Sequence, residues 1–442
     1  MKNFSMHNMI ERNELEFFMV IHVVQNGETI DSIAQTYGVN ANRLSFDNQV
    51  SMVGGLVEGQ SLLVLVPEEV YTVMEGETLE SIAQKYGTNV MTLARNNPVV
   101  LVDEVLNAGE QLIIRYQSEE KLGTMTVDGF AYPYILTDVF REVLAYLSEL
   151  SCFSYGFTTA GELIPIDDAA LLAGAFQYGV KPVLVLTPFG ELGNFSNELV
   201  SVLVNDETVQ ENLINNLTQM VQEKKYGGVN IDFEYVLAED RDAYISFVRK
   251  IRSRMNEIGV TVTVCLAPKI SDEQQGLLYQ GVDYAALGEA ADYVLVMTYE
   301  WGYTWGPAMA VSPINKVREV LDYAVSRIDP AKIRIGMSNY GYDWPLPYEK
   351  GVSKAETIGN VQALSIAREN GAVIQYNETS QAPYFTYTRD GVEHEVWFED
   401  ARSINARLRL VPEYGFDGVG YWTVMKPFRV NWLLVNELFN IR

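Results

Sequence analysis

Residues 226–235 read YGGVNIDFEY, and this stretch has the alternating pattern of a β-strand. In a strand, Asn230, Asp232 and Glu234 point to one face, and the apolar residues between them point to the other. Two acids at this spacing have Cα atoms roughly 6.6 Å apart. Because double ionisation is costly in a shared, partly desolvated site, we expect Glu234 to hold its proton near neutral pH. The stretch predicts a strand with one general acid and one charge stabiliser.

Apolar strands alternate with amphipathic helices from about residue 122 onward. The candidate strands are short and apolar: Met125–Tyr132, Phe153–Phe157, Pro182–Leu186, Val229–Phe233, Val260–Leu266, Tyr293–Tyr299, Ile333–Ser338 and Gly418–Trp422. Between the fourth and fifth strands, apolar residues at helical spacing predict a helix that ends at Gly259. Its buried face would comprise Tyr244, Phe247, Val248, Ile251 and Met255. Eight such units predict an α/β fold, a (β/α)8 TIM barrel over residues 122–442.

The alternation is interrupted after the seventh strand, over about residues 350–395. There Pro383–Tyr387, followed by Arg389, Asp390 and Gly391, is typical of a β-hairpin. We therefore expect a small α+β insertion beside the mouth of the barrel.

The composition argues against several classes of protein. The chain has 442 residues, of which 48% are hydrophobic, so two or three globular domains are expected. A formal net charge of −26 argues against nucleic acid or an anionic membrane as a partner. The two cysteines, Cys152 and Cys265, are too few for a disulfide framework or a cysteine-rich zinc site, and we expect both to be buried apolar residues.

Three histidines leave little room for histidine chemistry, and Gly336–Tyr340 lacks the closing glycine of a serine-hydrolase elbow. No residue constellation indicates a metal site or a cofactor, and none is expected. No apolar run approaches the roughly 18 residues of a membrane helix. Residues 1–18 are interpreted as an N-terminal extension without a signal peptide, because charged residues replace the apolar segment that a signal needs.

The first third of the chain contains a repeat with a period of 49 residues. VIHVVQNGETIDSIAQTYG, from Val20, recurs as VYTVMEGETLESIAQKYG, from Val70. Each copy predicts a strand, a helix capped by Thr29 or Thr78, a second helix and a closing strand. The predicted modules span residues 19–67 and 70–116. The polar stretches at 67–69 and 117–121 are interpreted as linkers.

The repeat resembles the LysM module in its GET turn, its S-I-A-x-x-Y-G helix and its G-x-x-L closing strand. That resemblance implies two small βααβ modules that bind glycans containing N-acetylglucosamine, such as peptidoglycan or chitin. The sugar would lie between the first strand–helix turn and the loop before the last strand. In the first module these positions are Gly27, Glu28, Thr29 and Ile30 with Leu56 and Val57; in the second they are Gly76, Glu77, Thr78 and Leu79 with Asn107 and Ala108. The alternative, that the threonines and glycines are only caps and turns, stays open.

The C-terminal three-quarters resemble glycoside hydrolase family 18, the chitinase-like group. Its fourth-strand signature is D-G-x-D-x-D-x-E, to which Gly228 (shifted by one place), Asp232 and Glu234 correspond, while Gly227 and Asn230 replace the first two acids. Met297-Thr298-Tyr299-Glu300 is similar to the M-x-Y-D of the sixth strand, and Trp422 to the tryptophan of the eighth. The S-x-G-G of the third strand is absent.

The resemblance implies substrate-assisted, retaining hydrolysis without a protein nucleophile. Glu234 would be the acid and base, Asp232 would orient the 2-acetamido group, and Tyr299 would donate to its carbonyl. Trp422 would form the floor of the −1 sugar pocket, the less favoured alternative being that it only fills the barrel. The other residues expected to bind or support the substrate are Asn230, Met297, Glu300, Trp301, Tyr340 and Trp344, with Trp305 as a further stacking candidate. Trp432 is expected in the core.

Twin LysM modules before such a barrel resemble the spore cortex-lytic N-acetylglucosaminidases of spore-forming bacteria. This implies a glycosidase that cleaves peptidoglycan after N-acetylglucosamine, located at the spore coat, cortex or cell wall. A chitinase and a non-catalytic glycan-binding protein are the alternatives. The sequence leaves open whether cleavage is endo or exo.

Overall fold

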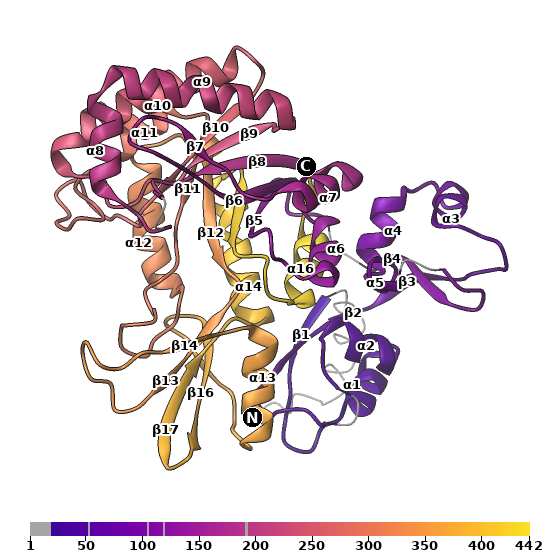
Figure 1. Ribbon diagram of the computed structural model, residues 1–442. Helices are drawn as coiled ribbons and strands as arrows, with labels where there is room; N and C mark the ends of the chain where they lie inside the picture. The colour runs from indigo at the N-terminus through magenta and orange to yellow at the C-terminus, as the bar shows by residue number, and fades with distance from the viewer. Residues whose placement is uncertain (1–18, 52–53, 104–105, 118–119, 191–192) are drawn as a thin grey trace, which may run out of the picture.

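The computed structural model describes residues 19–51, 54–103, 106–117, 120–190 and 193–442 (Figure 1). The predicted N-terminal extension, residues 1–18, lies outside the described residues. Two small modules at the N-terminus lie beside a barrel, and a separate sheet is added to the barrel near its C-terminal part.

Eight parallel strands close into the barrel, which confirms the predicted fold class. They are β5 (Thr124–Ala131), β6 (Glu149–Phe157), β8 (Lys181–Leu186), β9 (Gly228–Ile231), β10 (Thr261–Leu266), β11 (Tyr293–Val296), β12 (Ile333–Ser338) and β18 (Gly418–Trp422). Each pairs with the next in chain order, and β18 pairs with β5. Their near-continuous apolar runs suit strands that are buried on both faces.

Helices pack around the barrel. They are α6 (Thr137–Leu144), α7 (Ala169–Tyr178), α8 (Asn197–Asn205), α9 (Glu207–Lys224), α10 (Arg241–Asn256), α11 (Tyr284–Ala290), α12 (Ile314–Val325), α14 (Ala401–Leu408), α15 (Leu410–Tyr414) and α16 (Arg429–Leu438). The predicted apolar face of α10 is buried, and Gly259 after it has φ of +77°. Trp432 of α16 is fully buried, as expected.

Two barrel strands end earlier than the sequence predicts, and one begins earlier. The ladder of β9 stops at Ile231 and that of β11 at Val296, so Asp232, Glu234 and Tyr299 follow the strands instead of lying within them. After β11 the backbone turns locally, because Thr298 N–H donates to the carbonyl of Val296 at 2.9 Å. At the other end, β6 begins at Glu149, ahead of the predicted Phe153.

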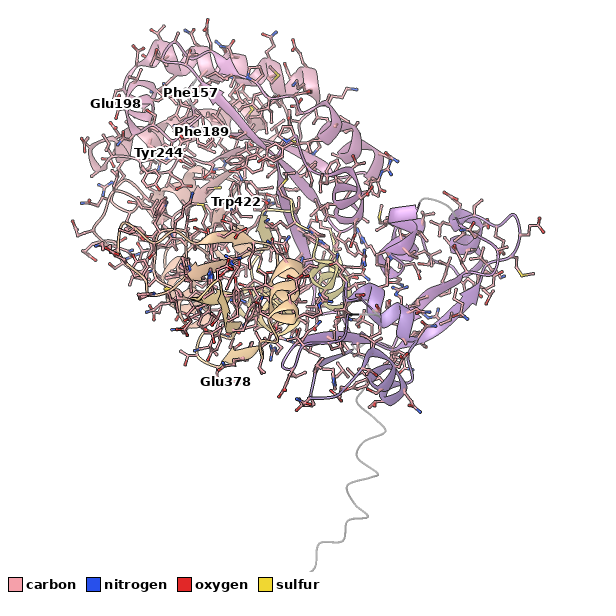
Figure 2. The ribbon with its side chains drawn as sticks, turned by 60° about the horizontal axis from the view of Figure 1, so that its bottom comes forward. Phe157, Phe189, Glu198, Tyr244, Glu378 and Trp422 are labelled. Atoms are coloured by element: carbon pink, nitrogen blue, oxygen red, sulfur yellow. The ribbon has the colours of Figure 1, made fainter. Side chains whose placement is uncertain are left out.

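An antiparallel sheet follows the seventh barrel strand. It contains β13 (Gly341–Pro345), β14 (Glu356–Ile358), β15 (Gln375–Asn377), β16 (Ala382–Arg389) and β17 (Val392–Trp397), with α13 (Asn360–Glu369) against it. We call residues 341–397 the insertion; it extends beyond both ends of the predicted range 350–395. The predicted hairpin is β16–β17, and its turn places Asp390 and Gly391 at φ of 52° and 79°. In Figure 2, Glu378 is labelled at the outer end of this sheet.

The two N-terminal modules have the predicted order of elements. The first contains β1 (Met19–Val23), α1 (Ile30–Tyr37), α2 (Ala41–Asp47) and β2 (Ser61–Leu65). The second contains β3 (Pro67–Thr72), α3 (Leu79–Lys85), α4 (Val90–Asn96), α5 (Val99–Asp103) and β4 (Gln111–Tyr116). Thr29 and Thr78 cap α1 and α3 through capping boxes with Ser32 and Ser81, as the sequence predicts.

The predicted linker at residues 67–69 is wrong, because Pro67 begins strand β3. The two modules are also joined by Arg43. Its guanidinium donates to the carbonyl of Asn96 at 2.6 Å and to the hydroxyl of Tyr116 at 2.8 Å. The modules therefore pack as a pair instead of moving independently on a flexible linker.

Candidate active site

The predicted catalytic residues converge at the C-terminal ends of the barrel strands. Asp232 and Glu234 follow β9, Tyr299 follows β11, and Trp422 ends β18. This end of a (β/α)8 barrel is where active sites form, since loops from several strands meet there.

Asp232 is buried, with 5% of its surface exposed, and its Oδ1 atom has no hydrogen-bond partner among the described residues. A buried carboxylate oxygen without a donor is costly unless a ligand supplies one. The side chain beneath it, Asn230, has no exposed surface, and its Oδ1 accepts from the thiol of Cys265 at 3.2 Å. Direct contact between Asn230 and a substrate is therefore excluded, and Asn230 supports the strand end from below.

The pKa values of Asp232 and Glu234 are set mainly by burial, and no cation among the described residues offsets it. Burial, then the negative charges of Asp232 and Glu300, raise the pKa of Glu234 to about 8. Burial also raises the pKa of Asp232, which the Cys265 thiol partly offsets. Each negative charge makes the other more costly, so the pair holds a proton at neutral pH, and Glu234 is its carrier.

Glu300 is held in place by two tyrosines of the region after β12. The hydroxyl of Tyr340 donates to Glu300 Oε1, and that of Tyr342 donates to the same oxygen at 3.0 Å. Burial raises the pKa of Glu300, and these two hydrogen bonds oppose the increase. Tyr340, expected at the substrate, is buried and orients Glu300 instead, and Tyr342 is a contributor that the sequence analysis did not identify.

Tyr299 packs beside the same loop, and its position depends on a glycine. A Cβ atom at Gly336 of β12 would lie 2.6 Å from the Cε1 atom of Tyr299. Only a glycine at this point of β12 leaves room for the Tyr299 ring.

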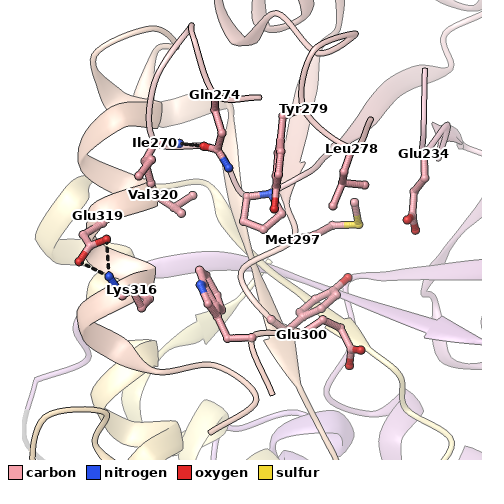
Figure 3. A pocket seen from close by; sticks show the side chains of 13 residues that line it. Glu234, Ile270, Gln274, Leu278, Tyr279, Met297, Glu300, Lys316, Glu319 and Val320 are labelled. Atoms are coloured by element: carbon pink, nitrogen blue, oxygen red, sulfur yellow. Dashed lines mark hydrogen bonds and ion pairs between the residues drawn. The ribbon is translucent and has the colours of Figure 1, made fainter. Parts of the chain in front are cut away.

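A pocket of about 330 Å³ opens next to Glu234 (Figure 3). Met297, Tyr299 and Trp301 line it, in agreement with their predicted place at the site. The other lining residues are Pro268, Ile270, Gln274, Leu278, Tyr279, Glu300, Lys316, Glu319 and Val320. Glu234 lies at one end, and the Lys316–Glu319 ion pair of α12, at 2.9 Å, lies at the other. The loop 268–279 has no periodic pattern, so the sequence analysis did not place it here.

Trp422 is half-buried among other aromatic rings of the barrel mouth (Figure 2). Its ring centroid lies 4.9 Å from that of Phe153, 5.9 Å from that of Phe130 and 6.1 Å from that of Tyr132. Tyr132 in turn stacks on the exposed Tyr134 at 5.1 Å. The edge contacts hold the indole in one orientation, and such a held ring is suited to packing on a sugar.

The remaining tryptophans have different environments. Trp344 has no exposed surface and donates its Nε1–H to the carbonyl of Gly306 at 2.9 Å, so the predicted stacking on a sugar is wrong. Trp305 is half exposed, and the ammonium of Lys354 lies 5.5 Å from its ring centre.

In the two N-terminal modules, most of the predicted glycan-binding residues have structural roles. The carboxylate of Glu28 accepts from the N–H of Gln25 at 2.7 Å, and that of Glu77 accepts from the N–H of Met74 at 2.8 Å. Ile30 is buried in the core of the first module. The reading of these residues as caps and turns therefore explains Glu28, Thr29, Ile30, Glu77 and Thr78. The capping residues Thr29 and Thr78 are nevertheless exposed, as are Gly27 and Gly76, and Leu79 is partly buried.

Within the described ranges, no group of three or more histidine, cysteine, aspartate or glutamate side chains is placed to hold a metal ion. Across the same ranges, none of the helices has the length and apolar character needed to cross a membrane.

Comparison with known proteins assigns families to both parts of the chain. The family model for glycosyl hydrolases family 18 matches residues 190–426, and the LysM domain model matches residues 22–64 and 71–115. The cortical fragment-lytic enzyme of Bacillus anthracis is 40% identical over 95% of this chain and 98% of its own length. That of Bacillus subtilis (strain 168) is 40% identical over 96% and 99%. The crystal structure of the Bacillus cereus spore cortex-lytic enzyme SleL superposes with a TM-score of 0.82 at 36% identity, covering 96% of this chain and 99% of that one.

Proposed function

Because the chain belongs to family 18 of the glycosyl hydrolases, we propose that it is a retaining N-acetylglucosaminidase that cleaves the β-1,4 bond after N-acetylglucosamine in peptidoglycan. One observation supports this most: Glu234, with a pKa raised to about 8, lies two residues from a buried aspartate whose Oδ1 has no donor among the described residues. Glu234 provides a general acid, and Asp232 is suited to accept a hydrogen bond from the N–H of an acetamido group.

The proposed reaction has two steps. In the first, Glu234 gives its proton to the glycosidic oxygen, the carbon–oxygen bond breaks, and the acetamido carbonyl oxygen of the substrate bonds to the anomeric carbon. Asp232 accepts the acetamido N–H and balances the positive charge of the oxazolinium ion, and Tyr299 donates to the acetamido oxygen. In the second step, Glu234 takes a proton from water, the water oxygen bonds to the anomeric carbon, and the bond between that carbon and the acetamido oxygen breaks, which retains the anomeric configuration.

Two arguments support peptidoglycan of the spore cortex as the substrate. The relatives that match this chain over nearly its full length are named as cortex-lytic or cortical fragment-lytic enzymes. The LysM modules belong to a class associated with glycans that contain N-acetylglucosamine, the same sugar whose acetamido group the proposed mechanism requires. We accordingly propose that the protein acts at the spore cortex or cell wall.

Digestion of purified spore cortex fragments tests the proposal. We expect wild type to release fragments with reducing N-acetylglucosamine ends, identified by mass spectrometry, and Glu234→Gln to release none above background. Chitin oligomers, digested in parallel, separate a peptidoglycan hydrolase from a chitinase by the ratio of kcat/KM. Release at the wild-type rate by the variant, or no cleavage of either substrate by wild type, would contradict the assignment.

A further inference from the structure

The two LysM modules offer a matched comparison at the expected sugar groove, between the strand–helix turn and the loop before the closing strand. Aligned on the closing strand, Glu58 and Gly59 of the first module correspond to Ala108 and Gly109 of the second. Val57 corresponds to Asn107. The LysM resemblance implies that these three residues would form one wall of the sugar groove in each module, so their surroundings decide whether a sugar can enter.

In the first module this wall is docked onto the insertion. Val57 is only 5% exposed and belongs to an apolar cluster with Ile358, Phe385 and Val396. The N–H of Ile374 donates to the carbonyl of Glu58 at 2.9 Å. The apolar contact and the backbone hydrogen bond together commit this loop to the insertion, and Figure 1 shows the module beside α13.

The backbones of the first module and of the insertion approach each other closely at Gly59 and Ile374. A Cβ atom at Gly59 would lie 1.9 Å from the carbonyl oxygen of Ile374. Arg402 of α14 donates to the carbonyl of Gly59 at 3.2 Å. A glycine is therefore required at this position both for its φ of +82° and for space.

The groove of the first module is also bridged by side chains. Asn26, in the strand–helix turn, donates its Nδ2–H to the Oε2 atom of Glu58, in the opposite wall, at 3.0 Å. A sugar between these walls would have to displace this hydrogen bond. With Val57 buried, Gly59 packed against Ile374 and the two walls linked through Glu58, the first module has less accessible surface at this position than the second.

The second module differs at every corresponding position. Asn107, Ala108 and Gly109 are exposed, and a Cβ atom at Gly109 would meet none of the described residues within 4 Å. Alanine has no side-chain acceptor, so Ala108 cannot form the bridge that Glu58 makes. Beside the turn, Met74 leaves 62% of its surface exposed, an apolar contact of the kind that a sugar ring can cover. Figure 1 shows α3 and this turn on the side of the module away from the barrel.

We propose that the second LysM module alone binds the glycan, and that the first is a docking module that fixes the insertion against the rest of the chain. The expected ligand is a strand of at least two sugars that contains N-acetylglucosamine. This inference rests on the proposed function for the identity of the glycan, but not on catalysis. Further contacts agree with a docking role, since the N–H of Arg429 in α16 donates to Gln49 Oε1 of the first module at 2.7 Å.

Binding to insoluble glycan tests the first half of the proposal. In a Glu234→Gln background, which prevents cleavage, Ala108→Tyr fills the groove of the second module, and Glu58→Tyr is the matched control in the first, since both positions are exposed. We expect Ala108→Tyr to weaken binding to cortex peptidoglycan at least about tenfold and Glu58→Tyr less than about twofold, by sedimentation with the insoluble glycan. Weakening by Glu58→Tyr as strong as that by Ala108→Tyr, or no effect of Ala108→Tyr, overturns the proposal.

The outcomes remain distinguishable from failure of the proposed function. Circular dichroism and the Tm establish that both variants are folded. In the Glu234 parent, kcat on soluble fragments measures catalysis separately from binding to the insoluble glycan. If the parent cleaves no glycan but the binding difference persists, the proposed activity fails while this inference stands.

Two alanine substitutions test the docking half. Gly59→Ala and Gly109→Ala cause similar backbone strain, because φ is +82° at one and +90° at the other. Only Gly59→Ala collides with Ile374. We expect Gly59→Ala to lower the Tm at least about 3 °C more than Gly109→Ala does. Equal shifts would mean that the first module is not anchored through this loop.

Discussion

The two ends of the barrel contain buried acids in opposite electrostatic settings. At the C-terminal ends of the strands, Asp232 and Glu234 face one another and Glu300, all negative when ionised. At the N-terminal ends, Arg334 of β12 contacts Glu149 at 2.7 Å and Asp417 at 2.8 Å. Lys181 of β8 approaches Glu149 at 2.6 Å.

The partner, and not the burial, decides how each acid titrates. Burial alone would raise the pKa of Glu149, but the charges of Arg334 and Lys181 outweigh it and lower the pKa. Among the residues that the structure describes, Glu234 has no such partner, and its pKa is raised. A paired acid contributes to stability, whereas an unpaired acid costs stability and can donate a proton.

Asp128 of β5 is a buried acid with a raised pKa that does not line the pocket. It is buried, burial and the nearby Glu149 raise its pKa to about 7, and its Oδ1 has no partner in the part of the chain that is described. Ser151 donates to its other oxygen at 3.0 Å. A raised pKa therefore does not by itself identify a catalytic acid; Glu234 differs because it also lines a pocket.

Substitution of Glu234, the acid at the barrel mouth, should have the largest effect on activity. Glu234→Gln keeps the shape of the side chain but removes the proton donor, so kcat on cortex fragments should fall about 10³-fold or more. The control is Glu149→Gln, whose folded fraction should retain kcat within about threefold. A comparable loss of kcat in both variants would show that the two ends do not differ in function.

Removal of the cation at the opposite end should have the next largest effect. Arg334→Met leaves two buried carboxylates without their main partner, and breaking a buried pair costs about 3–5 kcal/mol. The matched control is Arg318→Met, which breaks the exposed pair with Glu413 and should cost less than about 1 kcal/mol. Both are measured by urea unfolding; similar losses for the two arginines would contradict the assigned role of the Arg334 cluster.

The pH dependence of the reaction should reflect the acids at the C-terminal ends of the barrel strands and not those at the N-terminal ends. Glu234 acts as an acid only when protonated, and its pKa is raised to about 8. The value of kcat/KM should therefore decline as the pH rises through about 8. A decline near pH 5 would mean that burial and the charges of Asp232 and Glu300 do not raise the pKa of Glu234. The profile of initial rates against pH, in buffers of constant ionic strength, measures this.

A gain in stability is expected from the loss of Glu234, the acid at the barrel mouth. A carboxyl whose pKa is raised on folding ionises first in the unfolded chain, so stability falls as the pH rises from about 4.3, its unfolded value, to about 8, its folded value. Glu234→Gln removes this penalty and should stabilise the protein at pH 9, by up to about 5 kcal/mol for a pKa difference of this size, with no difference at pH 4. Thermal unfolding at the two pH values tests the sign, and destabilisation at pH 9 would contradict it.

Several site residues were predicted from local pattern, and the structure places these residues together at the barrel mouth. YGGVNIDFEY leads the chain from a buried strand to two acids at the barrel mouth, and Met297 and Tyr299 line the pocket beside them. Capping by Thr29 and Thr78 was equally readable, since a cap depends on residues within one helical turn.

Predictions that depended on contacts between distant segments were less successful. Trp344 and Asn230 have side chains suited to binding a sugar, yet both are fully buried. The loop 268–279, which contributes to the pocket lining, contains no motif. Tyr342 is recognised as part of the site only from its hydrogen bond to Glu300. Val57 and Asn107 occupy matching positions of a repeat, but only Val57 is covered by the insertion.

By itself the sequence determined the order of elements, the repeat and the strand end at which the acids lie, because hydrophobic periodicity, caps and turns act over a few residues. Only the tertiary structure decided which polar groups are buried together, which acids have a cation beside them and which of two similar modules has an open groove. Those outcomes depend on atoms brought together from segments far apart in the chain, and no local pattern specifies them.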